Sequence, residues 1–199
     1  NFILEGGSIE SDGKGTILTT AECLMAPNRN QLMTQDEIGD YLKQCLGAER
    51  VLWLYHGYLA GDDTDSHIDT LARFCDEHTI AYVKCNDPDD EHYETLKVME
   101  KELESFVAYD GRPYRLIDLP MANAAYCDEE RLPATYANFL IINGAVLVPF
   151  YGTHNDQIAE KQLQKAFPDR EIIGVDCRPL IRQHGSLHCV TMQFPIGFV

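Results

Sequence analysis

The chain has 199 residues, 45% of them apolar, which is enough to bury a core, and no run is long and apolar enough to cross a membrane. Its net charge of −16 argues against DNA or RNA as a partner, because nucleic acids select basic surfaces, and it suits a cationic substrate. The seven cysteines form no Cys-x-x-Cys pair, which favours free thiols in a reducing, cytoplasmic compartment over a zinc centre or a disulfide framework.

The first predicted unit has two strands, a helix and a third strand. Extended runs flank the turn "SDGKG", and the chain begins at Asn1 in what reads as a strand, as if it were cut from a longer protein. The helix spans 34–47: Thr34 and Glu37 make a capping box, and Gly47 ends it. Its predicted apolar stripe comprises Ile38, Tyr41, Leu42, Cys45 and Leu46. Residues 50–55, "RVLWLY", then read as a buried strand.

Two further units repeat this order of elements. The second has a hairpin over 67–85, a helix over about 88–106 and a strand at 114–120. The third has a hairpin over 135–152 with a type I′ turn at Asn143-Gly144, a helix over about 156–167 and a strand at 171–177. The run "GSLHCVTMQFP" reads as the first strand of a fourth unit. The sequence therefore predicts an α/β fold of repeated ββαβ units.

The residues suited to chemistry fall where these hairpins open. His67 and Asp69 start the second hairpin, Asn138 the third, and Cys189 the last strand. Loops at one end of a repeated scaffold are a usual place for a site. In a strand, His67 and Asp69 would share one face, while His188 would point away from the face of Cys189.

The acidic stretch "GDDTDSHID" allows several interpretations. It fails the EF-hand pattern, but a magnesium or manganese site stays open. Its carboxylates could instead clamp a planar guanidinium, or could simply form a solvated loop. Cys189 taken alone is typical of a small buried hydrophobe, and acidic neighbours would raise its pKa. A guanidinium beside the sulfur would favour the thiolate.

Four motifs together resemble one enzyme family. They are "LEGGSIESDGKGTILTTAECLMAPNRN", "GDDTDSHID" followed by "LARF" after Thr70, "YANFLIINGAVLVPFYG" and "GSLHCVTMQFP". In this order they resemble the agmatine deiminase and Porphyromonas-type peptidylarginine deiminase family of guanidino-modifying enzymes. The resemblance implies a pentein-type, five-fold α/β propeller of ββαβ modules. It also implies that residues 1–199 are a single deiminase-type catalytic domain lacking an N-terminal part, since the family's Arg-Asp-x-Gly-Pro motif does not occur.

The resemblance also implies roles for particular residues. Cys189 matches the nucleophile, His67 the general acid/base, and Glu5 a glutamate that orients the histidine. The matching substrate-binding residues are Asp63, Asp69 and Asn138. Two loops depart from the family pattern: many agmatine deiminases have glycine in place of Ser66, and a glycine run in place of "RQHG".

The implied reaction is hydrolytic deimination without a metal or organic cofactor. Agmatine and water would give N-carbamoylputrescine, a putrescine precursor, and ammonia through a covalent thiouronium on Cys189. Peptidylarginine deimination is one alternative, and an inactive fragment or binding module is another. The expected partner is a small cationic guanidino compound, and exposed strand edges would invite association into a homo-oligomer.

Overall fold

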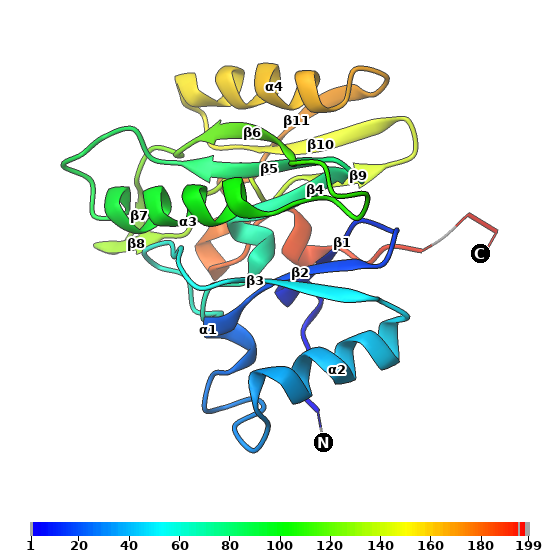
Figure 1. Ribbon diagram of the computed structural model, residues 1–199. Coiled ribbons are helices and arrows are strands. Elements are labelled where there is room, and N and C mark those ends of the chain that lie inside the picture. The colour runs from blue at the N-terminus through cyan, green and yellow to red at the C-terminus, as the bar shows by residue number, and fades with distance from the viewer. Residues whose placement is uncertain (1, 195, 198–199) are drawn as a thin grey trace.

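The computed structural model, which describes residues 2–194 and 196–197, contains three units with the same order of strands and helices (Figure 1). In each unit the first two strands pair antiparallel, and the third pairs parallel with the second after a helix. This order confirms the predicted ββαβ repeat. The first unit contains β1 (Ile9–Ser11), β2 (Thr16–Thr20), α1 (Ala21–Leu24), α2 (Gln35–Leu46) and β3 (Arg50–Leu54). The second contains β4 (Ala72–Asp76), β5 (Thr79–Lys84), α3 (Tyr93–Ser105) and β6 (Arg115–Pro120), and the third contains β9 (Leu140–Ile142), β10 (Ala145–Phe150), α4 (His154–Ala166) and β11 (Glu171–Asp176).

The ends of α2 are those the sequence predicts. Thr34 and Glu37 form the capping box, and Gly47 takes a left-handed conformation with φ 68° just beyond the helix. The predicted apolar stripe is only half correct. Ile38 and Leu42 are buried beneath α2, whereas Tyr41, Cys45 and Leu46 are exposed. Because α2 lies at the margin of the molecule (Figure 1), β3 is also only partly buried, where the sequence predicted a buried strand.

Helix α3 begins later than the predicted residue 88, and helix α4 begins at His154, slightly earlier than the predicted residue 156. The chain before α3 is held in turns, in which the Asp90 carboxylate accepts from the backbone N–H of His92, so α3 begins only at Tyr93. The predicted type I′ turn is also wrong. The hairpin between β9 and β10 does form, but Gly144 takes a positive φ of 81° and Asn143 does not.

Two regions predicted as strands are instead single 3₁₀ turns. Ile68–Thr70 forms one and His188–Val190 the other, and the described part of the last predicted strand, up to residue 194, has no strand. Residues 2–5, also predicted as a strand, belong to no strand. A short hairpin that the sequence analysis missed, β7 (Ala125–Cys127) with β8 (Glu130–Leu132), links the second and third units.

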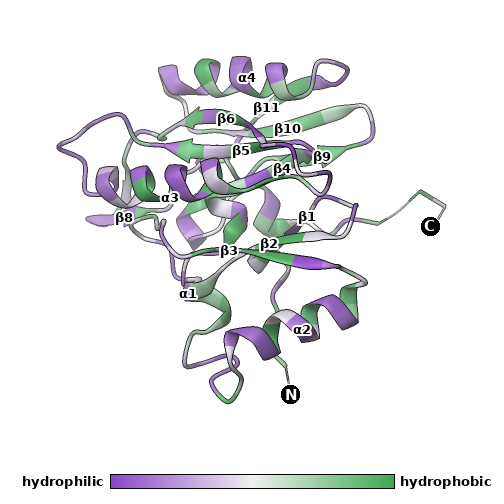
Figure 2. Ribbon diagram, viewed as in Figure 1, coloured by the Kyte–Doolittle hydropathy of each residue, from purple (hydrophilic) through white to green (hydrophobic). Residues whose placement is uncertain are grey.

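The core runs from unit to unit. Leu18 and Leu54 of the first unit pack with the interior of the second, and Tyr136 and Phe139 are fully buried where the second and third meet. Figure 2 shows hydrophobic residues along much of β10 and mixed character on the helices, as expected for helices that cover one face of a sheet. Among the described residues, no helix has the length and apolar character needed to span a membrane.

Candidate active site

Segments that are far apart in the sequence meet in one cluster. Asp69 lies in the 3₁₀ turn that precedes β4 and is 1% exposed. Its Oδ2 accepts hydrogen bonds from Asn138 Nδ2 at 3.2 Å and from His188 Nδ1 at 2.8 Å, and lies 3.8 Å from Cys189 Sγ. Its Oδ1 is buried and has no hydrogen-bond partner among the described residues. A buried carboxylate oxygen without a donor is costly, so this atom is suited to a ligand that brings one.

Asn138 links this carboxylate to the cysteine segment. The residue is fully buried, and its Oδ1 accepts from the backbone N–H of His188 at 2.8 Å and of Cys189 at 3.4 Å. Its Nδ2 lies 3.4 Å from Cys189 Sγ. These side-chain contacts take the place of a strand partner, which explains why the chain turns here instead of extending. Asn138 therefore fixes where the Cys189 sulfur lies relative to Asp69.

The surroundings of Cys189 hold its thiol protonated. The residue is exposed as a whole, but its sulfur faces the buried side of the cluster. Burial of the sulfur is the main reason that the pKa of Cys189 is raised, and the charge of Asp69 raises it further. The Ser186 backbone and the Asn138 side chain lower it less. A cation placed beside the sulfur would favour the thiolate.

This raised pKa predicts a pH profile for alkylation. The rate at which iodoacetamide modifies Cys189 in the free protein should keep rising as the pH passes 9, because the thiolate is the reacting form. Peptide mass analysis after timed labelling would follow Cys189 separately, with the exposed Cys45 as the internal reference. A rate that levels off below pH 8 would contradict the proposed environment.

Glu5 and His67 form a second pair beside the first cluster. Glu5 Oε2 accepts from Arg29 Nε at 2.7 Å and lies 3.3 Å from His67 Nε2. Burial alone would raise the pKa of Glu5, but its hydrogen bonds with Arg29 and His67 outweigh this effect and lower the pKa. A charged Glu5 accepts a hydrogen bond from Nε2–H of His67, which leaves Nδ1 of the ring free for proton transfer.

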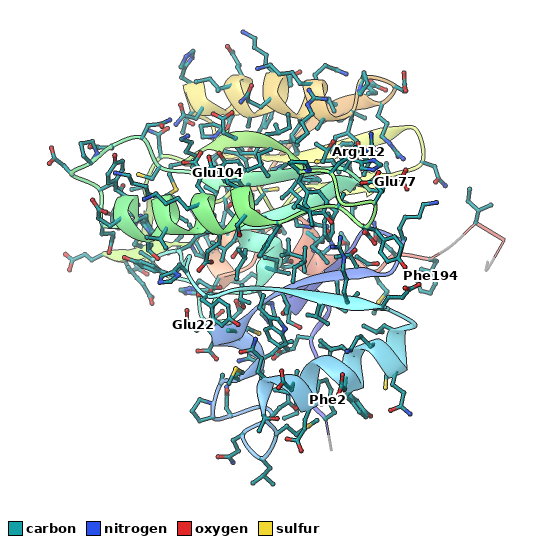
Figure 3. The ribbon with its side chains drawn as sticks, in the orientation of Figure 1. Phe2, Glu22, Glu77, Glu104, Arg112 and Phe194 are labelled. Carbon is teal, nitrogen blue, oxygen red and sulfur yellow. The ribbon has the colours of Figure 1, made fainter. Side chains whose placement is uncertain are left out.

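The segment that carries Glu5 is fixed at several points. Phe2 packs against Tyr41 on α2 with ring centroids 4.5 Å apart, and Figure 3 shows Phe2 beside that helix. Asn30 Oδ1 accepts from the backbone N–H of Ile3 at 3.0 Å. Arg29 donates from Nη1 to Asp65 Oδ2 at 2.6 Å as well as binding Glu5. The position of Glu5 therefore depends on the loops around it.

Gly7 is the point where the two clusters meet. A Cβ atom at this position would lie 2.7 Å from His67 Nδ1 and 2.9 Å from each carboxylate oxygen of Asp69. Only glycine leaves room for both side chains at their present positions. The His67 Nδ1 atom and the Asp69 carboxylate therefore border the same small space.

Gly7→Ala is expected to lower kcat/KM for the deimination that the family resemblance implies by about 100-fold, because displacing positioned groups by about 1 Å costs that much. Steady-state ammonia release would measure this. Gly6→Ala is the matched control, since a Cβ there meets nothing within 4 Å. Equal activity of the two variants would show that the crowded space beside Gly7 has no role in the reaction.

His188 is a site residue that the sequence analysis placed on the wrong face. In a strand it would point away from the Cys189 face, but the 3₁₀ turn brings its Nδ1 to Asp69. Its Nε2 lies 3.3 Å from Arg73 Nη2. Arginine can only donate, so Nε2 accepts and Nδ1–H donates to Asp69. Arg73 in turn forms a buried ion pair with Glu10. A signal for this chain of contacts is absent from the local sequence pattern.

Asp63 is the predicted site residue that the structure does not bring into the cluster. Its side chain is exposed, and among the described residues it has no hydrogen bond or ion pair. Other carboxylates of the loop have structural partners: Asp62 accepts from Thr64 and from the backbone N–H of Ser66, and Asp65 binds Arg29. With two of its carboxylates occupied in this way, the loop gives no support to a magnesium or manganese site.

Comparisons with known proteins agree with one another. Residues 1–195 match the family described as Porphyromonas-type peptidyl-arginine deiminase. A Marinomonas sp. (strain MWYL1) protein, provisionally named an agmatine deiminase, is 38% identical over 98% of this chain and 57% of its own length. A Porphyromonas gingivalis structure, provisionally described as an arginine deiminase, is 63% identical with a TM-score of 0.97 over 100% of this chain and 58% of its own. A C. jejuni agmatine deiminase variant with substrate bound is 49% identical with a TM-score of 0.90, over 95% of this chain and 55% of its own. The chain thus spans a little over half the length of these relatives.

Proposed function

The chain belongs to the Porphyromonas-type peptidyl-arginine deiminase family. We propose that it carries most of an active site that hydrolyses a guanidino group, and that agmatine is the substrate. One observation carries the proposal. The Asp69 carboxylate has a buried Oδ1 without a hydrogen-bond partner among the described residues, and its Oδ2 lies 3.8 Å from the Cys189 sulfur. The carboxylate would bind a planar cation, and the sulfur would lie beside its central carbon.

Binding would also activate the nucleophile. The guanidinium donates hydrogen bonds to Asp69, which satisfies Oδ1 and compensates the carboxylate charge that raises the pKa of Cys189. The pKa of the thiol then falls when the substrate is present. A low thiolate content in the free protein is therefore compatible with catalysis.

The proposed chemistry has two halves. With the substrate bound, the Cys189 thiol gives its proton to Nδ1 of His67, and the thiolate forms a C–S bond to the guanidinium carbon. His67 then passes this proton from Nδ1 to the departing nitrogen, and the C–N bond breaks to release ammonia. Water then loses a proton to His67 and adds to the same carbon. The C–S bond breaks, so the ureido product leaves and the thiol is regenerated. Glu5 and Asn138 position the acid/base and the sulfur respectively.

The identity of the substrate is tested by paired assays. The agmatine deiminase names of the Marinomonas and C. jejuni relatives favour agmatine, while the family description keeps peptidylarginine as the second candidate. Assayed with the full-length protein, ammonia release from agmatine should exceed release from an arginine peptide blocked at both ends, with N-carbamoylputrescine as the product. Release from the peptide alone would favour the second candidate, and release from neither would favour a binding module.

We extend the proposal to the architecture around the site. Residues 1–199 are taken as part of a single deiminase domain, a pentein-type five-fold propeller whose remaining modules come from the rest of the protein. The coverage of about 57% of the relatives supports this. Asp63, exposed here, would then contact the substrate from the rim of the completed site, and a cytoplasmic homo-oligomer is the proposed form. Ammonia release by the full chain but not by residues 1–199 would agree with this arrangement.

A further inference from the structure

A cysteine that the proposed reaction does not use lies beside the proposed acid/base. One donor atom each from Glu5, Cys23 and His67 lies within 4.8 Å of the other two. The three residues are scattered along the sequence, and for this reason their spacing gave no sign of a metal site. They come together because α1, the N-terminal segment and the turn before β4 converge there.

Each of the three side chains is held by its own surroundings. Cys23 is fully buried in α1; its backbone N–H donates to Thr20 Oγ1, and its carbonyl accepts from Arg29 Nη1 at 3.4 Å. The His67 side chain is only 10% exposed. The Glu5 side chain is 43% exposed, so an ion would enter from its side.

The electrostatic surroundings of Cys23 favour a cation. The carboxylates of Glu5, Asp65 and Asp62 and the guanidinium of Arg29 are the charged groups that act on the Cys23 sulfur. Three carboxylates therefore act on the sulfur against one guanidinium. The field that disfavours a lone thiolate would be balanced by a divalent ion bound to it.

We propose that Glu5, Cys23 and His67 form an inhibitory zinc site. Sulfur, imidazole nitrogen and carboxylate oxygen are the donors that zinc takes, and three protein ligands leave a fourth position for water. Ligand atoms around tetrahedral zinc lie roughly 3.3–3.6 Å apart, so separations of up to 4.8 Å would shorten by about 1.2–1.5 Å at most. Zinc binding displaces the Cys23 proton to solvent. Arg29 can keep its hydrogen bonds to Glu5, as the outer partners of metal-bound carboxylates do.

The ion would stop deimination without touching Cys189. Zinc bound at Nε2, the nitrogen that faces Glu5, leaves a neutral ring whose one proton lies on Nδ1, so His67 can no longer accept a proton there, and Glu5 would no longer orient the ring. This consequence rests on the function proposed for His67. Zinc binding itself does not, because the donor set is defined by geometry alone.

The test measures zinc binding and activity separately. The full-length protein, kept under reducing conditions, is dialysed against buffered zinc, and the bound metal is measured. Ammonia release from agmatine is followed in parallel with and without EDTA. We expect about one ion per chain and an activity that zinc removes and EDTA restores. Cys23→Ser should weaken zinc affinity by about 100-fold or more, since even outer partners of a ligand contribute about 10- to 100-fold. The exposed Cys45→Ser is the matched control and should bind as the parent does.

Two further variants decide between outcomes. Cys189→Ser should keep the zinc affinity, and His67→Asn should lower it. If Cys23→Ser does not fold, as judged by circular dichroism, the binding by Cys189→Ser and His67→Asn still decides. Unchanged affinity in a folded Cys23→Ser or His67→Asn protein, or affinity lost in Cys189→Ser, would overturn the proposal. Zinc bound as expected by a protein with no deiminase activity would instead count against the proposed function alone.

Discussion

Cys189→Ser is expected to lower ammonia release from agmatine by at least about 10⁴-fold, the scale on which removal of a catalytic nucleophile acts. The serine hydroxyl keeps the position but has a far higher pKa than the thiol, so it stays protonated even when the guanidinium compensates the charge of Asp69. Binding should survive, because Asp69 and its unpartnered Oδ1 are unchanged. Steady-state ammonia assays and equilibrium binding of agmatine would measure the two effects separately.

The control for this variant is another exposed cysteine. Cys45→Ser, on the outer side of α2, should keep full activity. If Cys189→Ser retained near-normal ammonia release, the nucleophile would have to be another group and the mechanism would fail.

Asp69→Asn is expected to reduce kcat/KM by roughly 30- to 4,000-fold, because truncating one partner of a buried charged pair costs about 2–5 kcal/mol. Asparagine keeps an acceptor for His188 but loses the charge that the guanidinium needs. The same change removes a charge that raises the pKa of Cys189, so that pKa should fall. Catalysis would therefore drop while the thiol becomes easier to alkylate at neutral pH. Kinetics and iodoacetamide labelling of one preparation would show both.

This opposite response separates a substrate-binding carboxylate from a structural one. A variant that had merely unfolded locally would expose other buried thiols, such as Cys23 and Cys177, to the same reagent. Asp169→Asn, an exposed change in the turn between α4 and β11, should alter neither measurement. An Asp69→Asn protein with unchanged kcat/KM would contradict the assigned role.

The repeat and the elements could be predicted from the sequence because their signals are local. The Thr34–Glu37 capping box, Gly47 and the turn at "SDGKG" each act within a few residues, and each is found in the structure. The strand assignments at 67–70 and 185–194 were wrong for the opposite reason. There the backbone follows contacts with distant side chains, above all Asn138, that no local pattern contains.

Some residues of the candidate site could be predicted from the sequence, and others needed the fold to be recognised. The family resemblance named Cys189, His67 and Asp69, and the structure places Cys189 and Asp69 in contact and His67 beside Glu5. Local periodicity placed His188 on the wrong side, because a 3₁₀ turn and a strand direct neighbouring side chains differently. The Glu10–Arg73–His188 contacts span more than 100 residues and needed the fold itself to be recognised.

The central claim is that Cys189 attacks a guanidinium held by Asp69, and the most direct measurement is the mass of the enzyme during turnover. The full chain should be mixed with agmatine, quenched in acid within the turnover time, digested and examined by mass spectrometry. The peptide containing Cys189 is expected to gain the mass of agmatine less that of ammonia. The amount of this modified peptide in the Cys189→Ser and His67→Asn proteins should differ from the amount in the parent enzyme. An enzyme that releases ammonia at full rate while the Cys189 peptide never changes mass would contradict the account.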